Sequence, residues 1–114
     1  EKILAEVKLK ELIDSLPDGI NTNLGNMGFK ISGGQMQRIG IARALFRDPK
    51  IIILDESTNS LDKKTEQDIL SIFNGIDYKD KIIISISHDN QTFKYFDKIL
   101  FLKNGKILTQ KKMK

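Results

Sequence analysis

The chain contains no cysteine and no tryptophan, and its single histidine is His88. The absence of cysteine excludes disulfides and thiolate zinc sites, and a lone histidine argues against a histidine-ligated metal centre. Long apolar runs are also missing: the longest, such as Ile51 to Leu54, have four residues, whereas a membrane span needs about 20. Glu1 begins no signal-like segment. The composition therefore favours a reducing, cytosolic setting and predicts no membrane-spanning segment in this chain.

The charge of the chain does not indicate a nucleic-acid-binding protein. The net charge is +4, but the lysines are scattered and aromatic residues make up only 7% of the 114 residues. A basic stripe interleaved with stacking aromatics is therefore absent, and no nucleic-acid partner is expected. The one local cluster, Lys111, Lys112 and Lys114, is predicted to be a frayed tail.

Hydrophobic patterning predicts an alternation of helices and strands. One or two short helices are expected over residues 3–16, ended by the turn residues Pro17-Asp18-Gly19. Further helices are expected over 34–47, 63–73 and 91–95, and in the first of these Ile39, Ala42, Leu45 and Phe46 should face inward. Continuous β-branched runs predict strands at 51–54 and 82–87, and Asn104-Gly105 predicts a hairpin turn between 99–102 and 107–108. The strand–helix–strand order is typical of a parallel sheet, whose strands would be buried on both faces.

Two adjacent glycines, Gly33 and Gly34, open the helix that follows Ile31. Each glycine costs about 1 kcal/mol relative to alanine in a helix interior, so the pair needs a reason. One reason is a phosphate cradle, because a helix N-terminus without side chains lets an anion reach unpaired N–H groups. The alternative is a serine N-cap at Ser32 followed by flexible glycines, and the stretch alone leaves both readings open.

Two carboxylates, Asp55 and Glu56, follow the first predicted strand directly. Ligands of open parallel sheets bind outside the carboxyl ends of the strands, where both acids would lie. In phosphoryl transfer one such carboxylate holds Mg²⁺ and its neighbour orients or activates a water molecule. The alternative is a solvated pair of loop acids.

His88 and Asp62 occupy similar positions in this pattern. His88 follows the second predicted strand, so it should lie near Glu56 at the same edge of the sheet. A lone histidine is more often structural or exposed than catalytic, and that alternative stays open. Asp62 precedes the helix predicted from residue 63, where an N-cap is its simplest role.

The four sites together resemble one family in both order and spacing. Ile31-Ser32-Gly33-Gly34-Gln35, with Gln37 and Arg38, is similar to the signature motif of ABC ATPases. Residues 51–56 resemble their Walker B strand, Ser60-Leu61-Asp62 their D-loop, and His88 their switch histidine. The resemblance extends through nearly the whole chain, because residues 99–107 are similar to the strand and turn that follow the switch.

The resemblance implies roles for these residues. Glu56 and His88 would be catalytic, and Asp55 would hold Mg²⁺. Contacts to ATP would come from five further residues: Ser32, Gly33, Gly34, Gln35 and Asp62. Because two such domains close head to tail, the signature residues would contact a nucleotide bound to a second nucleotide-binding domain.

The segment before the signature, Leu16 to Gly28, resembles the loop that contacts the membrane domain in exporter-type members. Asn23 and Asn26 stand where that loop usually carries glutamate. A G-x-x-x-x-G-K-[ST] phosphate loop is missing from the sequence. We therefore expect the carboxyl-terminal half of a nucleotide-binding domain, which is inactive alone and lies at the cytoplasmic face of the cell membrane through a transmembrane domain outside this chain.

The expected fold is α/β: an incomplete parallel sheet of the P-loop NTPase kind with flanking helices, plus part of the ABC helical subdomain. Residues 1–47 would end the helical subdomain, and residues 48–114 would form the carboxyl-terminal part of the ATPase core. The expected function is ATP hydrolysis coupled to export. The alternatives are a soluble ABC ATPase of translation or DNA maintenance and an inactive interaction module, and retention of Glu56 favours activity over the module.

Overall fold

The computed structural model describes residues 1–25, 31–56 and 61–113, and its secondary structure follows the predicted alternation. The predicted turn at Pro17-Asp18-Gly19 separates two short helices from the rest of the chain. In chain order the elements are α1 (Lys2–Glu6), α2 (Lys10–Asp14), η1 (Gly19–Asn21), α3 (Gly33–Phe46), β1 (Ile51–Asp55), α4 (Lys63–Ile72), η2 (Ile76–Tyr78), β2 (Ile82–Ile86), η3 (Asn90–Tyr95), β3 (Lys98–Lys103) and β4 (Lys106–Lys112). The predictions made for Asn26, Gly28, Ser60 and Lys114 concern residues that lie outside the described ranges.

The strands form a parallel pair and a separate hairpin. β1 pairs with β2 in a register that runs from Ile51 opposite Ile82 to Asp55 opposite Ile86, and α4 lies between them in the chain, as a parallel connection requires. β3 and β4 are antiparallel and joined at Asn104-Gly105, where both residues have positive φ, as the tight hairpin turn predicts. The α/β fold with a parallel sheet is thereby confirmed.

The basic carboxyl-terminal segment is ordered as a strand, so the expectation of a frayed tail is wrong for its described part. Lys111 lies opposite Ile99 and Lys112 opposite Lys98 in the β3–β4 ladder. Backbone hydrogen bonding in the hairpin holds these lysines, while their side chains remain exposed.

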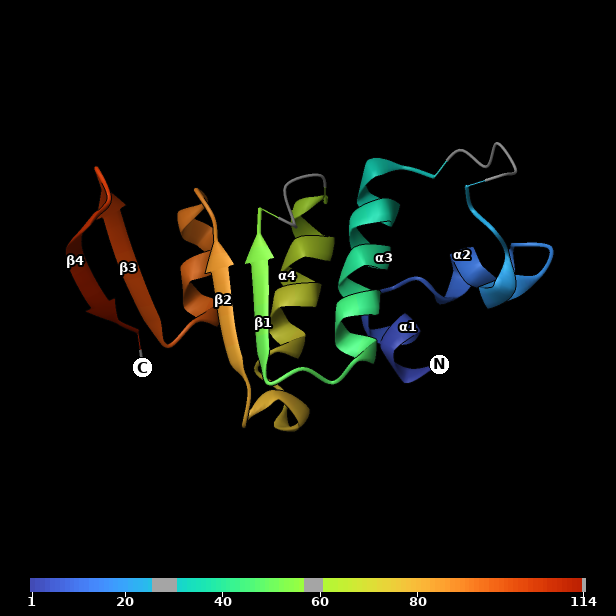
Figure 1. The fold of residues 1–114 in the computed structure, drawn as a ribbon, viewed down its shortest axis with the longest axis horizontal. Coiled ribbons are helices and arrows are strands. Elements are labelled where there is room, and N and C mark those ends of the chain that lie inside the picture. Colours follow the sequence, from blue (N-terminus) through green and yellow to red (C-terminus); the bar gives the residue numbers. More distant parts are fainter. Residues whose placement is uncertain (26–30, 57–60, 114) are drawn as a thin grey trace.

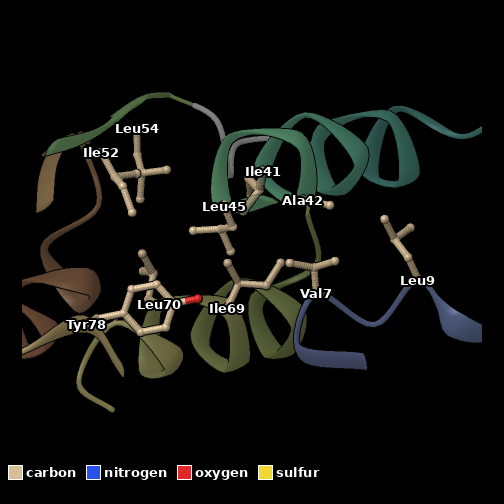
Figure 2. Close-up of a cluster of buried hydrophobic side chains, with 10 residues drawn as sticks. All are labelled: Val7, Leu9, Ile41, Ala42, Leu45, Ile52, Leu54, Ile69, Leu70 and Tyr78. Carbon is tan, nitrogen blue, oxygen red and sulfur yellow. The ribbon is translucent and has the colours of Figure 1, made fainter. Parts of the chain in front are cut away.

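The hydrophobic core lies between α1, α3, α4 and one face of the parallel sheet (Figure 2). Ile69 and Leu70 of α4 contribute two of its most deeply buried side chains. The full cluster consists of Val7, Leu9, Ile41, Ala42, Leu45, Ile52, Leu54, Ile69, Leu70 and Tyr78. Tyr78 also reaches Glu6 of α1 with its hydroxyl at 3.2 Å, and burial raises the pKa of Tyr78 to about 12.

The prediction that the strands are buried on both faces is wrong. Ile52 and Leu54 are only 4% exposed, but Ile53 is 64% and Ile84 47% exposed. Alternate strand residues point to opposite faces, so one face packs against α3 and α4 while the other carries exposed isoleucines. Among the described residues this second face is left open. Patterning identified the apolar strands correctly but could not say which face had a covering element.

The inner face of α3 also differs from the prediction at one residue. Ala42 and Leu45 are buried and Ile39 packs against the core, but Phe46 at the helix end is 81% exposed. Phe46 lies on the same side of the helix as Ala42, but it is the last residue of α3, and no described element covers it there.

The elements are spread along the long axis of the molecule, from α2 at one end to the β3–β4 hairpin at the other (Figure 1). The radius of gyration is 15.8 Å, compared with about 13 Å for a compact domain of this length. Both β1 and β2 end at the edge of the molecule where α3 and α4 begin (Figure 1). No helix in the described ranges is long and apolar enough to cross a membrane.

Candidate functional site

The N-terminus of α3 is held by a complete capping box. Oγ of Ser32 accepts a hydrogen bond from the backbone N–H of Gln35 at 3.1 Å, and Oε1 of Gln35 accepts from the backbone N–H of Ser32 at 2.8 Å. This reciprocal pair satisfies two of the donors that a helix start leaves unpaired. The cap uses only Ser32 and Gln35 and does not require glycine at positions 33 and 34, so capping alone does not explain the two glycines.

Arg38 braces the same end of α3 against the amino-terminal helices. Its Nη1 donates to the carbonyl oxygen of Lys8 at 2.7 Å, and its Nε donates to the carbonyl of Gly34 at 3.4 Å. Lys8, which lies between α1 and α2 with φ of 55°, also forms an ion pair with Asp68 of α4. The first turns of α3 are thus tied to both neighbouring elements.

The N-terminus of α4 is capped by Asp62, as the sequence predicts. Its Oδ1 accepts from the backbone N–H of Thr65 at 3.0 Å, and its Oδ2 accepts from the hydroxyl of Thr65 at 2.6 Å. These hydrogen bonds, the hydroxyl one foremost, hold the pKa of the Asp62 carboxyl below its usual value. Both oxygens of Asp62 are therefore engaged within its own helix.

The starts of α3 and α4 share an open pocket of about 430 Å³. Two helix N-termini on one pocket give it a positive field, because each contributes partial positive charge from its unpaired N–H groups. The guanidinium of Arg38 adds a full positive charge, which the ionised carboxylate of Asp62 at the start of α4 offsets, so the positive field is concentrated at the start of α3. The lining residues are Ser32, Gly33, Gly34, Arg38, Leu61, Asp62 and Thr65.

The second group of predicted residues lies at the carboxyl ends of the parallel strands. Asp55 is the last residue of β1, and the backbone N–H of Glu56 donates to the carbonyl of Ile86 at 3.3 Å. Nε2 of His88 lies 3.1 Å from Oε1 of Glu56. The structure thus brings together Glu56 and His88, 32 residues apart in sequence.

The backbone of Glu56 adopts a left-handed conformation with φ of 47°. Non-glycine residues rarely occupy this region, and such strained positions cluster at functional sites. The side chain of Glu56 is 46% exposed and that of His88 88% exposed. This edge is therefore open to solvent, unlike the braced helix starts.

Asp55 fits a magnesium ion whose remaining ligands are oxygens of phosphate and water. The described residues hold no group of three or more His, Cys, Asp or Glu side chains placed to bind a metal ion. Mg²⁺ at phosphoryl-transfer sites needs only one or two carboxylates, with the remaining ligands from phosphates and water. Exposed Asp55, at the end of β1, meets that requirement.

Three residues of this edge were not predicted as site residues. Thr65 lines the pocket, and its signal was present because it occupies the third helical position after Asp62. Lys63 and Asp89 form an ion pair of 2.8 Å between the start of α4 and the residue after His88. No local pattern predicts a pair between residues 26 positions apart.

Comparison with known proteins gives a consistent result. A family model described as ABC transporter matches residues 1–59. Multidrug resistance protein 1 of Plasmodium falciparum is 48% identical over 97 residues, which is 84% of this chain and 7% of that protein. An ATP-dependent lipid A-core flippase of Ralstonia nicotianae is 37% identical over 107 residues, covering 94% of this chain and 18% of the flippase.

A solved structure of a bacterial Atm1-family ABC exporter with ATP bound superimposes with a TM-score of 0.84 at 37% identity. The match covers 98% of this chain and 20% of the exporter chain. The chain likewise spans about a fifth of the length of the first curated relatives that it matches. The family model covers half of the sequence, and the fold extends the match over nearly all of it, so the chain belongs to the ABC transporter family.

Proposed function

We propose that this chain supplies the signature motif, Walker B strand, D-loop and switch histidine of an ATP-hydrolysing domain in an ABC exporter. The observation that carries the proposal is the 3.1 Å approach of His88 to Glu56 at the carboxyl ends of parallel strands, the edge at which such sheets bind ligands. The reported relatives are named as a flippase, a multidrug resistance protein and an exporter, which favours export over a soluble ABC ATPase of translation or DNA maintenance.

In this proposal Asp55 and Glu56 divide the chemistry at the strand end. The carboxylate of Asp55 would hold Mg²⁺, which would neutralise charge on the phosphates. Glu56 accepts the proton of the attacking water, because its carboxylate is exposed at the strand end and can approach a solvent molecule. Nε2 of His88 orients the Glu56 carboxylate through the contact between them.

The pocket at the two helix starts has a different role in the proposal. Gly33 and Gly34 present backbone N–H groups, and Ser32 its hydroxyl, to the terminal phosphate of ATP bound by a second nucleotide-binding domain, within the positive field of the helix start. Gln35 and Asp62 contribute through the caps that hold this geometry. Because the capping box does not require glycine at positions 33 and 34, close approach of phosphate to the backbone explains why glycines stand there.

The remaining parts of the proposal concern the intact protein. Residues 1–47 belong to the helical subdomain, residues 48–114 to the ATPase core, and the segment before Ser32 contacts a transmembrane domain at the cytoplasmic face of the membrane. The phosphate loop, which the sequence lacks, comes from the remainder of the protein. The scattered positive charge and the low aromatic content favour a function without a nucleic-acid partner.

The proposal is tested by measuring MgATP binding and turnover for the intact protein and for the 114-residue chain in parallel. We expect the intact protein to hydrolyse ATP in reconstituted membranes and the isolated chain to show no micromolar affinity by calorimetry, because the phosphate loop provides most contacts. An intact protein that binds no ATP would support the inactive interaction module. Micromolar binding of MgATP by the isolated chain would refute the expectation that the primary nucleotide site lies outside these 114 residues.

A further inference from the structure

The start of α4 and the loop that carries His88 are joined by an ion pair. Nζ of Lys63 lies 2.8 Å from Oδ2 of Asp89, and it also reaches Oε1 of Gln91 at 3.5 Å. Lys63 is the first residue of α4, and Asp89 is the N-cap of η3. The pair therefore connects the first turns of two helices from separate parts of the chain.

Hydrogen bonds within its own loop orient Asp89 independently of Lys63. Its Oδ1 accepts from the backbone N–H of Gln91 at 2.8 Å, and its backbone N–H donates to Oγ of Ser87 at 3.1 Å. Its carbonyl accepts from the hydroxyl of Thr92 at 2.8 Å, and Thr92 is buried. These contacts fix the carboxylate and leave Oδ2 directed at Lys63, so less side-chain freedom is lost when the pair forms.

The position of Lys63 at the start of α4 is unfavourable for a cation that has no partner. A cation in the first turn of a helix is unfavourable, because it faces the positive end of the helix dipole. The carboxylate of Asp89 offsets this repulsion, and it raises the pKa of the Lys63 ammonium through their hydrogen bond. The pKa of Asp89 is lowered in turn, mainly by Lys63.

The two partners lie immediately beside residues of the two proposed half-sites. Lys63 follows Asp62, which caps α4 and lines the pocket. Asp89 follows His88, which contacts Glu56. The contacts Glu56–His88 and Lys63–Asp89 thus lie on neighbouring residues of the chain, and Lys63 is joined to the pocket through the adjacent Asp62.

We propose that Lys63 and Asp89 are positioning residues that hold the His88 loop against the first turn of α4, and thereby link the geometry of the strand-end acids to that of the pocket. This inference rests on the proposed function of the same edge. Neither residue touches the reacting atoms. Their effect is on the placement of His88, and so on the rate of the chemical step more than on nucleotide affinity.

The test uses the intact protein with Lys63→Gln, Asp89→Asn and the double variant. Asparagine keeps an oxygen for the cap of η3 but removes the charge. Because an exposed pair is worth little in itself, we expect each single variant to lower kcat by about 2- to 5-fold, with KM for MgATP nearly unchanged. The double variant should be no slower than the slower single variant, since both substitutions remove one interaction.

Two further measurements separate positioning from general structure. Lys64→Gln, one residue along α4, is the matched control and should retain parental kcat. Sodium chloride at about 0.5 M should lower the parental kcat toward that of Lys63→Gln and leave the variant unchanged, because salt screens exposed charges. Lys63→Arg should restore the parental rate, since it restores the cation.

The proposal is overturned if the two single effects multiply in the double variant, or if Lys63→Gln matches Lys64→Gln. Failure of the underlying function gives a different result. If Glu56→Gln leaves turnover intact in the same assay, the proposed roles of the strand-end acids are wrong. If Glu56→Gln abolishes turnover while the Lys63 and Asp89 effects multiply, only the positioning pair is wrong.

Discussion

The pocket at the starts of α3 and α4 and the acidic edge at the ends of β1 and β2 lie on the same side of the molecule but are built differently. In the pocket, Ser32, Gln35 and Asp62 make hydrogen bonds within their own helices, and Arg38 braces the first turn of α3. At the strand ends, His88 is 88% exposed and meets Glu56 through one contact.

This difference indicates which half of the proposed site is held in place by local contacts within this chain. Helix caps are local, so residues three positions apart complete the pocket geometry without help from distant segments. Strand-end carboxylates depend on what the neighbouring strands and loops bring to them, and the open second face of the β1–β2 sheet belongs to the same region. The following experiments challenge this contrast.

Glu56→Gln in the intact protein should give the largest effect. The substitution keeps the shape of the side chain but removes the group that accepts a proton, so we expect kcat to fall by about 10²- to 10⁴-fold with ATP binding retained. The measurement is steady-state ATP turnover together with equilibrium nucleotide binding. Glu11→Gln on α2, remote from the site, is the control. If Glu56→Gln kept turnover within a few-fold of the parent, Glu56 would not be the base.

Gly34→Asp tests the pocket side of the comparison. If phosphate approaches this helix start, the new carboxylate repels it by an energy on the order of 4 kcal/mol, and ATP-dependent dimerisation and turnover should fall by about 100-fold or more. If the glycines serve only the helix, aspartate in the first turn complements the dipole by about 0.3–1 kcal/mol and raises the melting temperature without loss of turnover.

The control for Gly34→Asp is Gly40→Asp on the same helix. Gly40 is exposed, and an added Cβ there meets no atom within 4 Å. This variant introduces the same charge away from the pocket, so it should retain nucleotide-dependent dimerisation. Equal losses in both variants would assign the effect to α3 itself and refute the phosphate approach.

The two faces of β1 extend the comparison to the sheet. Ile52→Ala should destabilise the 114-residue chain by about 2–5 kcal/mol, because Ile52 packs in the core. Ile53→Ala, on the open face, should change its free energy of unfolding by no more than about 0.5 kcal/mol. Urea unfolding measures both, and similar losses would show that the second face is covered in solution.

The same face should make the isolated chain self-associate, since exposed apolar patches of this kind favour association. We expect sedimentation to show oligomers whose proportion falls in the Ile53→Thr/Ile84→Thr variant. Ile20→Thr, which removes an equally exposed isoleucine outside the sheet, is the matched control. A monomer at high concentration with a high melting temperature would contradict the expectation.

The smallest expected effect is a difference in the pH dependence of stability between variants of the two caps of the pocket, Asp62 and Ser32. The pKa of Asp62 is lowered in the folded chain, so its contribution to stability is present above the ordinary value of 3.8 and is lost as the pH falls through the folded pKa. Asp62→Ser should therefore flatten the acid limb of stability below about pH 4. Ser32→Ala should lower stability by about 1 kcal/mol at every pH. An unchanged acid limb in Asp62→Ser would contradict the role of the carboxylate.

Much of this edge could be predicted from the sequence because its signals are local. The Asp62 cap, the hairpin turn at Asn104-Gly105 and the strand before Asp55 each depend on residues within a few positions of one another. The placement of Glu56 beside His88 also followed, because parallel strands end at one edge. Thr65 was missed, although it belongs to the same local cap.

The sequence by itself determined where the main helices and strands lie, that Asp62 and Ser32 cap two of the helices and which strand end carries acids, because these features follow from neighbouring residues. Only the tertiary structure decided that Lys63 pairs with Asp89, that Arg38 reaches the carbonyl of Lys8, and that Ile53 lies on an open face. Such contacts join segments distant in the chain or depend on which elements cover a surface. Their formation is governed by packing geometry, which local residue patterns do not encode.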